Sequence, residues 1–245
     1  MLDIKDLSFS YAGQEIIKTI SFSVDENVCV AILGPSGCGK TTVLKLIAGL
    51  LMPCSGVLVN KFRREETGFV FQDFCLLPWR TVKENVALVL HDKKMSAVDK
   101  NQRIDHALVI TGLDDFAEKY PYELSGGMQQ RTGLARALAV QPSLLLMDEP
   151  FSNVDGQTRG LLVEEFREIA STVPMTIVMV THNIDDVLDL ADQVMLFSGQ
   201  PASIMERLDI KGYLQDIGRE ALRQLIWEKL RSQVKYNDCV GTRHA

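Results

Sequence analysis

The segment GPSGCGKT, residues 34–41, constrains the fold of this chain more than any other feature. It matches the pattern G-x-x-x-x-G-K-[ST], and it stands between a short apolar run, VCVAILG, and a stretch with helical spacing, TVLKLIAGL. Glycines in such a loop let backbone N–H groups curve around a phosphate without Cβ clashes. The sequence therefore predicts a strand, a phosphate-binding loop and a helix, which together indicate an α/β fold.

Three side chains of this loop have chemistry of their own. Lys40 supplies a positive charge for the β and γ phosphates of a nucleotide. The Thr41 hydroxyl suits Mg²⁺, which keeps few protein ligands beside phosphate oxygens. Cys38 precedes the expected helix N-terminus, a position that predicts a lowered pKa for its thiol, and we assign the thiol no role in the chemistry.

A second segment, SLLLMDEP at 143–150, provides two carboxylates. Its apolar run predicts a buried strand ending at Asp148, where a carboxylate can hold Mg²⁺ directly or through water. Glu149 follows at once and is suited to orient or deprotonate a water that attacks the γ-phosphate. An Asp-Glu pair after a strand is usually a solvated turn, but a complete phosphate loop in the same chain favours the catalytic interpretation.

The rest of the chain alternates between strand and helix patterns around a helical insertion. Residues 2–11 and 15–24 alternate in strand fashion about a turn at 12–14, which predicts an antiparallel hairpin or meander. Helical patterns dominate from about 73 to 140, at 81–92, 99–113 and 128–140. Further strands are expected at 57–60, 68–72, 175–182, 193–199 and 200–207, and further helices at 163–172 and 184–191.

The C-terminal stretch 213–235 predicts a single amphipathic helix. Its apolar residues form roughly one stripe, made of Leu214, Ile217, Ala221, Leu225 and Leu230. Such a stripe usually packs on the body of its own domain, and a dimer or partner contact is the alternative. Residues 237–245 are expected to form a frayed tail.

Composition excludes several classes of function. The 245 residues carry a formal net charge of −6 without a long basic run, so no nucleic-acid partner is expected. The 5 cysteines include no C-x-x-C pair, which disfavours a disulfide scaffold or a zinc site and favours a reducing, cytosolic setting. The N-terminus lacks a signal region and the apolar runs are too short to cross a bilayer, so any membrane span must come from another chain.

The segment ELSGGMQQR, residues 123–131, is the most specific motif. A Ser-Gly-Gly turn that opens a helix offers N–H groups and the positive end of the helix dipole to an anion. Together with the motifs above, it makes residues 1–205 resemble the nucleotide-binding subunit of ATP-binding cassette (ABC) transporters. The resemblance implies a P-loop NTPase fold with a RecA-like core, an N-terminal antiparallel β subdomain and an inserted helical subdomain at about 73–140. Residues 206–245 would form a C-terminal helical extension and tail.

The resemblance also implies a role for each motif residue. ATP with Mg²⁺ would bind at an adenine-stacking tyrosine and at nine consecutive loop residues: Tyr11, Gly34, Pro35, Ser36, Gly37, Cys38, Gly39, Lys40, Thr41 and Thr42. Hydrolysis would depend on Glu149, His182 and Gln72, and the metal ligands would be Thr41, Gln72 and Asp148. A second subunit, in a head-to-tail dimer, would supply Ser125, Gly126, Gly127 and Asp155.

Two positions depart from the common pattern of the family. The signature usually reads LSGGQ, and here Met128 takes the place of the glutamine, whose hydrogen bonds it cannot make. The loop that crosses to the second subunit usually reads SALD, and here it reads Ser-Asn-Val-Asp at 152–155. We expect function to survive the first change, and the second leaves the contact between subunits open.

Within the family, three stretches resemble the importer ATPases for nitrate, sulfonate, taurine and related small anions: DFCLLPWRTVKENVAL, EPFSNVDGQTR and ADQVMLFSGQPASI. The resemblance implies an ATP-hydrolysing subunit, peripheral at the cytoplasmic face of the cell membrane. It would pair with a copy of itself or a second ATPase subunit, bind membrane permease subunits, and serve a solute-binding protein indirectly. The alternatives are the ATPase of an exporter or envelope-maintenance complex, and an ABC ATPase that transports nothing.

The segment Asp73–Thr81, called the coupling segment below, is the expected contact with the permease. It follows Gln72 directly, so it can report the state of the nucleotide. Its apolar side chains, Phe74, Leu76, Leu77 and Trp79, suit a groove for a helix of a membrane subunit. The alternative is that they pack inward, and we expect about half of this surface to be exposed.

Overall fold

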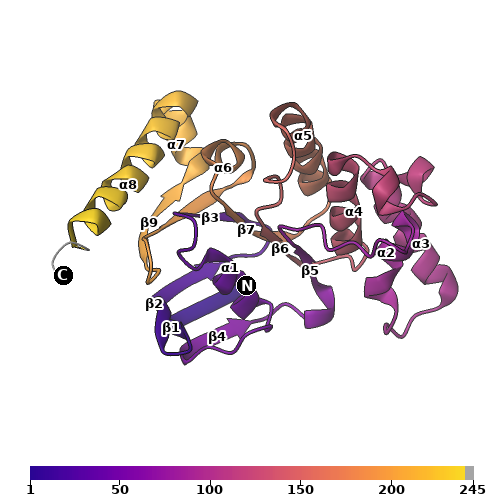
Figure 1. The fold of residues 1–245 in the computed structure, drawn as a ribbon, viewed down its shortest axis with the longest axis horizontal. Helices are drawn as coiled ribbons and strands as arrows, with labels where there is room; N and C mark the ends of the chain where they lie inside the picture. Colours follow the sequence, from indigo (N-terminus) through magenta and orange to yellow (C-terminus); the bar gives the residue numbers. More distant parts are fainter. Residues whose placement is uncertain (241–245) are drawn as a thin grey trace. The chain divides into compact units, whose positions relative to one another are not determined.

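The structure is a computed structural model that describes residues 1–240, with side chains to residue 231. The chain divides into two compact units. The first unit comprises Met1–Lys61 and the chain from Val178 onward, and the second comprises Phe62–Ile177. Figure 1 gives the helix and strand labels used below.

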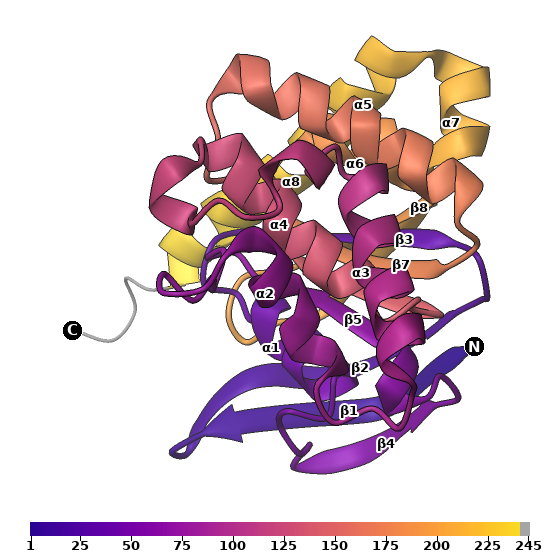
Figure 2. The same cartoon turned by 90° about the vertical axis from the view of Figure 1, so that its right-hand side faces the viewer.

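The first unit begins with a three-stranded antiparallel sheet in the order β2-β1-β4. These strands lie side by side in Figures 1 and 2, and they are β1 (Leu2–Tyr11), β2 (Gln14–Val24) and β4 (Ser55–Asn60). A tight turn joins the first two strands, with positive φ at Ala12 (47°) and Gly13 (86°). The antiparallel arrangement expected at the N-terminus is therefore confirmed.

The same unit contains a parallel strand pair flanked by an antiparallel edge. Strand β3 (Cys29–Leu33) pairs in parallel with β8 (Gln193–Phe197), which pairs antiparallel with β9 (Ile204–Asp209). All five residues of β3 are buried, as its unbroken apolar run predicts. The helices of this part are α1 (Lys40–Ile47) and α6 (Ile184–Leu190).

The C-terminal stretch differs from its prediction. It forms two helices, α7 (Ile210–Ile217) and α8 (Arg219–Val240), because Gly218 takes a positive φ of 78° and breaks the helical register. Among the α8 residues with described side chains, 219–231, Leu222 and Ile226 are buried, four residues apart, while Ile217 and Ala221 of the expected stripe are exposed.

Helix α8 packs against α6 within the first unit. Arg219 bonds Asp189 at 2.6 Å, and Arg223 lies 3.2 Å from Asp185. The expected packing on the body of the domain thus occurs. Three residues of the expected stripe are half-buried: Leu214, Leu225 and Leu230. Helix α8 also extends to Val240, into the stretch expected to be a frayed tail; the remainder of that stretch lies outside the described residues.

The second unit combines a parallel strand pair with most of the helices. Strand β5 (Thr67–Val70) pairs in parallel with β6 (Leu144–Asp148), and β7 (Thr176–Thr181) runs across the boundary between the units. Its α-helices are α2 (Val82–Ala87), α3 (Ala97–Ile110), α4 (Gly126–Leu138) and α5 (Gly156–Thr172). Its 3₁₀ helices are η1 (Arg64–Glu66), η2 (Leu88–Leu90), η3 (Asp114–Phe116) and η4 (Pro121–Glu123).

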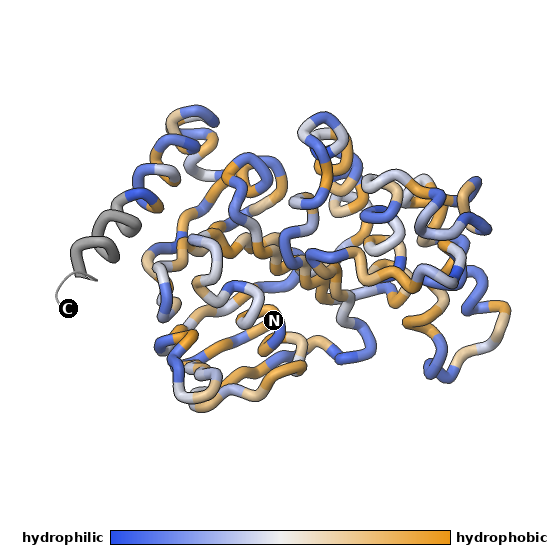
Figure 3. The backbone as a smooth tube through the Cα atoms, viewed as in Figure 1, coloured by the Kyte–Doolittle hydropathy of each residue, from blue (hydrophilic) through white to orange (hydrophobic). Residues whose placement is uncertain are grey.

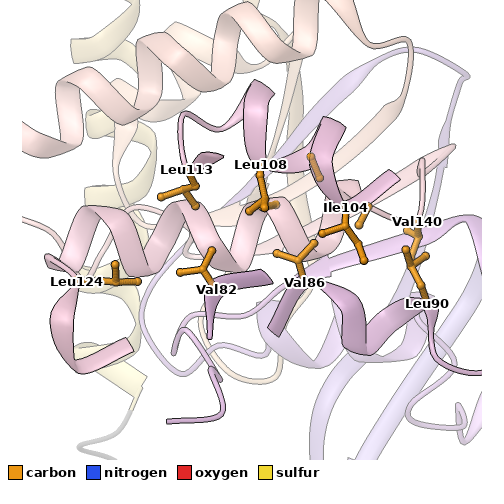
Figure 4. Close-up of a cluster of buried hydrophobic side chains, with 11 residues drawn as sticks. Val82, Val86, Leu90, Ile104, Leu108, Leu113, Leu124 and Val140 are labelled. Carbon is orange, nitrogen blue, oxygen red and sulfur yellow. The ribbon is translucent and has the colours of Figure 1, made fainter. Parts of the chain in front are cut away.

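A hydrophobic cluster joins α2, α3 and α4 (Figure 4). Its fully buried members include Val82, Val86 and Leu113. Hydropathy along the chain follows burial: the buried strands β3, β6 and β7 are hydrophobic, and polar residues recur along the outer helices (Figure 3).

Helical structure dominates the range 73–140, as expected. The boundaries proposed for the domains stay a prediction.

Two features are absent from the part of the chain that the structure describes. None of the helices in residues 1–240 is both long and apolar enough to cross a membrane. In the same part of the chain, no three His, Cys, Asp or Glu side chains are grouped so that they could hold a metal ion by themselves.

Candidate functional site

The phosphate loop follows β3 and leads into α1, as its motif predicts. The side chain of Lys40 is 5% exposed, and its Nζ donates to the carbonyl oxygens of Gly34 at 2.9 Å and Pro35 at 2.8 Å. These two bonds close the loop on its own lysine. The ammonium group is therefore held inside the curve of the loop, at the start of a helix, where an anion is favoured.

Two loop residues explain why the motif needs its small side chains. Gly39 has φ 111°, and a Cβ there would lie 3.0 Å from Cγ2 of Ile16. Cys38 is 2% exposed, and burial raises the pKa of its thiol. The lowered pKa expected from its place before a helix is therefore wrong, because desolvation outweighs the nearby Lys40 charge.

Tyr11, at the end of β1, has the exposure that stacking on a ligand requires. Its side chain is 53% exposed. Its ring meets the ring of Phe9 edge to face, with centroids 5.0 Å apart and planes at 83°. Tyr11 thus contacts Phe9 while about half of its surface stays exposed.

The two carboxylates after β6 occupy different environments. Asp148 is the last residue of β6 and only 5% exposed. Glu149 has φ 45°, a left-handed conformation that costs a residue with a side chain roughly 1–3 kcal/mol. Ser152 stabilises this turn, since its backbone N–H and its hydroxyl both donate to the Glu149 carbonyl, at 3.2 and 2.9 Å. Strain of this kind is typical of functional positions.

The signature motif forms the N-terminus of α4. Ser125 is its N-cap, and the Ser125 hydroxyl accepts a hydrogen bond from the N–H of Met128 at 3.2 Å. Ser125 and Gly126 are exposed. Gly127 is buried, and a Cβ there would lie 2.8 Å from Cγ2 of Thr158 in α5, so the close approach of the two helices requires glycine.

The structure explains how the departure at Met128 is accommodated. The Met128 side chain packs against the hydrophobic cluster of α2, α3 and α4. The following residue, Gln129, donates from its amide to the carbonyl of Pro121 at 2.9 Å, which ties the helix to the turn before it. Position 128 is therefore a packing position in this chain.

The coupling segment is irregular, and buried side chains from elsewhere hold its backbone. Arg136 of α4, 9% exposed, donates to the carbonyls of Phe74 at 2.9 Å and Cys75 at 2.7 Å, and burial lowers the pKa of its guanidinium. Asn85 of α2, 0% exposed, accepts from the N–H of Leu77 at 2.8 Å and donates to the carbonyls of Leu77, Arg80 and Thr81. Sequence reasoning missed both residues; the only signal was a polar residue inside each apolar helical stripe.

With the backbone fixed in this way, the coupling segment presents apolar side chains outward. Trp79 is 70% exposed, and Phe74, Leu76 and Leu77 are half-buried. The expected mixture of exposed and inward-facing surface is therefore present. The role of this surface stays a prediction.

The crossing loop precedes α5 and contacts the residue before the coupling segment. Asp155 is the N-cap of α5: it accepts from the N–H groups of Gln157 and Thr158, each at 3.1 Å. The Thr158 hydroxyl also donates to it at 2.7 Å, and this bond is the main reason why the pKa of Asp155 is lowered. Asn153 donates from its side-chain amide to the carbonyl of Gln72 at 2.8 Å.

His182 lies in the tight turn between β7 and α6, and it is exposed. The residues on both sides of His182 form side-chain hydrogen bonds. The Thr181 hydroxyl donates to buried Asp186 at 3.1 Å and accepts from the N–H of Asn183 at 3.1 Å. Asn183 caps α6 by accepting from the N–H of Asp185 at 2.7 Å. The histidine backbone is thus fixed by its neighbours.

The predicted site residues divide between the two units. The first unit carries the phosphate loop, Tyr11 and His182. The second carries Gln72, the two carboxylates after β6, the signature motif and Asp155. Within the second unit, hydrogen bonds directly join Gln72 to the crossing loop and the coupling segment to the signature helix.

Comparison with known proteins decides the family. The ABC transporter family (ABC_tran) matches residues 17–152. The chain belongs to the ABC transporter family. The α/β fold of ABC type and the family resemblance drawn from the motifs are therefore confirmed.

Individual relatives agree with this assignment. The chain is 43% identical over 201 residues to the nitrate import ATP-binding protein NrtC of Synechococcus elongatus; the match covers 78% of this chain and 30% of that protein. It is 40% identical over 213 residues to the taurine import ATP-binding protein TauB of Roseobacter denitrificans, covering 83% of this chain and 80% of that protein. The chain thus spans less than a third of the longer nitrate import protein.

A solved ABC structure shares the fold. It is a dimeric ATP-binding cassette in a post-hydrolysis state, bound to ADP and Pi, with a TM-score of 0.73 and 28% identity. The likeness covers 86% of this chain and 99% of that chain. The roles of the individual site residues stay predictions.

Proposed function

We propose that this chain is the ATP-hydrolysing subunit of an ABC importer. The observation that carries the proposal is the strained Glu149 directly after buried Asp148, in a chain that also has a complete phosphate loop. The relatives named as nitrate and taurine import ATP-binding proteins support the direction of transport. They favour an importer over an exporter, an envelope-maintenance complex or a non-transport ATPase.

ATP would bind at the phosphate loop, residues 34–42, with its adenine against Tyr11. The Lys40 ammonium would exchange its bonds to two loop carbonyls for contacts with the β and γ phosphates. Stacking on Tyr11 adds affinity with little base specificity, since every base has a π face. The exposure of Tyr11 and the buried position of Lys40 support this arrangement.

The residues present fit a magnesium ion. The Thr41 hydroxyl, the Gln72 side-chain carbonyl and the Asp148 carboxylate are oxygen donors of the kind that Mg²⁺ prefers, and three protein ligands leave room for phosphate oxygens and water. When bound, the ion would neutralise charge on the phosphates. A buried carboxylate such as Asp148 is favoured by a nearby cation, because burial otherwise penalises its charge.

Glu149 would act as the base for hydrolysis and His182 would contact the γ-phosphate. The Glu149 carboxylate would accept a proton from the water that attacks the γ-phosphate in line, and His182 would help to orient the group. The bonds from Ser152 to the Glu149 carbonyl fix where this side chain leaves the backbone. This fixed direction supports a positioned base.

A second ATPase subunit, identical or different, would complete each site. The N-terminus of α4, with exposed Ser125 and Gly126 and buried Gly127, would meet the γ-phosphate bound by the other chain, and Asp155 would lie at the same contact. ATP would favour the closed dimer because these contacts exist only there. The dimeric state of the related solved cassette supports this arrangement.

The membrane partner would be a permease subunit that binds the coupling segment. Exposed Trp79 offers an apolar anchor, and its fixed backbone suits transmission of movement from Gln72. The chain would thus be peripheral at the cytoplasmic face of the membrane, acting indirectly on a solute-binding protein. The transported solute would be a small anion such as nitrate, a sulfonate or taurine, by likeness to the import relatives.

The substitution Glu149→Gln tests the proposal. It should lower ATP turnover by about 100-fold or more, because amide nitrogen and oxygen cannot accept the proton, while ATP binding persists and the ATP-bound dimer becomes longer-lived. Steady-state assays measure ATP turnover, and light scattering in the presence of ATP measures dimer formation. The matched control is Glu164→Gln, the same change at an exposed position of α5, which should leave both unchanged. Near-normal turnover by Glu149→Gln would reject Glu149 as the base.

A further inference from the structure

Two adjacent residues, Ser152 and Asn153, form hydrogen bonds to two different site residues. The Ser152 hydroxyl donates to the carbonyl of Glu149 at 2.9 Å. The Asn153 amide donates to the carbonyl of Gln72 at 2.8 Å, across 81 positions of sequence. The segment 149–154 contains no helix or strand, and these two side-chain bonds act beside the backbone bond from the Ser152 N–H to the Glu149 carbonyl.

The chemistry of the Asn153 contact is specific. A backbone carbonyl only accepts hydrogen bonds, so the group that faces it must be a donor. The side-chain amide supplies an N–H donor. A carboxylate of the same shape would place an acceptor against an acceptor, and the alanine of the commoner loop sequence has neither group.

In the part of the chain that the structure describes, the Asn153 hydrogen bond joins the Gln72 backbone directly to the segment 149–155. Before Gln72, β5 ends at Val70; after it, Arg136 fixes Phe74 and Cys75 from the signature helix. The first anchor is shared with the strand before Glu149, because β5 pairs with β6 and Val70 lies opposite Met147. The Asn153 bond adds a direct tie from the Gln72 carbonyl to the turn that follows Glu149.

We propose that Asn153 is a positioning residue, which holds Gln72 at a fixed separation from Glu149 and from the crossing loop. The inference rests on the proposed function, in which Gln72 meets the metal and Glu149 serves hydrolysis. Closure of the dimer on the crossing loop would then move Asn153 and Gln72 together. Where the common pattern has a small residue, Asn153 thus links the Gln72 backbone directly to the crossing loop.

The test is Asn153→Asp, which keeps the shape of the side chain and removes the donor. Its control is Asn101→Asp, which adds the same charge at an exposed position of α3 in the same unit. Hydrogen–deuterium exchange of the nucleotide-free chain should show about three- to tenfold faster exchange around residues 72–75 for Asn153→Asp only, the fold-change for losing one hydrogen bond. This readout does not depend on activity.

Kinetics supply the second readout. Asn153→Asp should lower kcat about three- to tenfold and raise the Mg²⁺ concentration for half-maximal rate, with the KM for ATP unchanged, because the phosphate loop is untouched. A variant that matches Asn101→Asp in both exchange and kinetics would overturn the inference. A lower melting temperature with kcat unchanged would also overturn it, since Asn153 would then be merely structural.

The Glu149→Gln variant, measured in parallel, separates the two proposals. If Glu149→Gln is inactive while Asn153→Asp behaves as its control, only the positioning role of Asn153 fails. If Glu149→Gln hydrolyses ATP normally, the proposed function fails, and the inference fails with it.

Discussion

The phosphate loop and the coupling segment solve the same structural problem in opposite ways. Both are irregular stretches whose backbone must be held in one shape. The phosphate loop is closed by its own lysine, five and six residues from the carbonyls that accept its bonds. The coupling segment is held by Arg136, whose partners lie 61 and 62 positions away, and by Asn85 of the next helix.

This difference decides what each region can do. A loop closed by nearby residues keeps its shape whatever the surrounding helices do, which suits the binding of a phosphate. A segment held by a distant helix follows that helix when it moves, which suits the transmission of movement from the signature helix to a partner. The comparison therefore predicts local effects for changes in the first region and long-range effects for changes in the second.

The largest effect is expected for Lys40→Ala. The change removes the charge proposed to bind the β and γ phosphates and the two bonds that close the loop. ATP turnover should fall by about 100-fold or more, as for the loss of a charge-stabilising group in other active sites. Steady-state ATPase assays and ATP titrations measure the effect.

The control for Lys40→Ala is Lys45→Ala, the same change one turn further along α1, where little effect is expected. Because the loop is self-contained, melting of the helical part around α2, α3 and α4 should not change. Wild-type turnover by Lys40→Ala would contradict the assignment of the phosphate loop.

The next effect is expected for Arg136→Leu. The leucine keeps an apolar side chain at the buried position but is shorter than the arginine, and it leaves the carbonyls of Phe74 and Cys75 without their donor. Loss of these charge-assisted bonds should lower the free energy of unfolding by about 2–4 kcal/mol, measured by urea denaturation.

Arg136→Lys sharpens this prediction, because it keeps the charge and loses the fork that reaches both carbonyls. An intermediate loss of stability is expected. Faster hydrogen exchange should appear in the coupling segment, far away in sequence. If the rate of hydrogen exchange changed in α4 alone, the long-range role of Arg136 would be contradicted.

The smallest effect on the isolated chain is expected for Trp79→Ala. The side chain is 70% exposed, so stability should change by no more than about 0.5 kcal/mol and ATP turnover should stay similar. Coupling to the membrane subunits should weaken, measured as transport per ATP in reconstituted vesicles. A loss of ATP turnover in the isolated chain would instead show that Trp79 packs inward in the working protein.

The same contrast explains what the sequence could predict. The strands, the phosphate loop, the Ser125 cap and the helical insertion follow from local pattern, and the structure contains each of them. The break at Gly218 was missed because an isolated glycine is tolerated in many helices, and its spacing alone does not show that it takes a positive φ of 78°. The bonds of Arg136 and Asn153 join segments 61 to 81 positions apart, and no local pattern encodes such pairings.

Met128 and Cys38 show the same limit within the motifs. The sequence gives no sign that Met128 packs on the helical cluster, because that cluster assembles from three helices. The position of Cys38 before α1 predicts a lowered pKa, whereas its burial, which depends on the tertiary fold, raises it. The spacing of the motifs therefore identifies Met128 and Cys38 as motif positions. The burial and the contacts of these two side chains could be known only from the structure.

The most direct test of the proposed shared site is a mixing experiment with two inactive variants. Lys40→Ala disables the phosphate loop, and Ser125→Arg blocks the signature with a bulky side chain, so each variant alone should be inactive. In a mixed dimer, one site combines both defects and the other combines an intact loop with an intact signature. Mixing equal amounts should therefore restore ATP turnover to about a quarter of the wild-type rate, since about half of the dimers would carry one complete site of two. No recovery, in a mixture shown to exchange subunits, would contradict the claim that two chains build each nucleotide site.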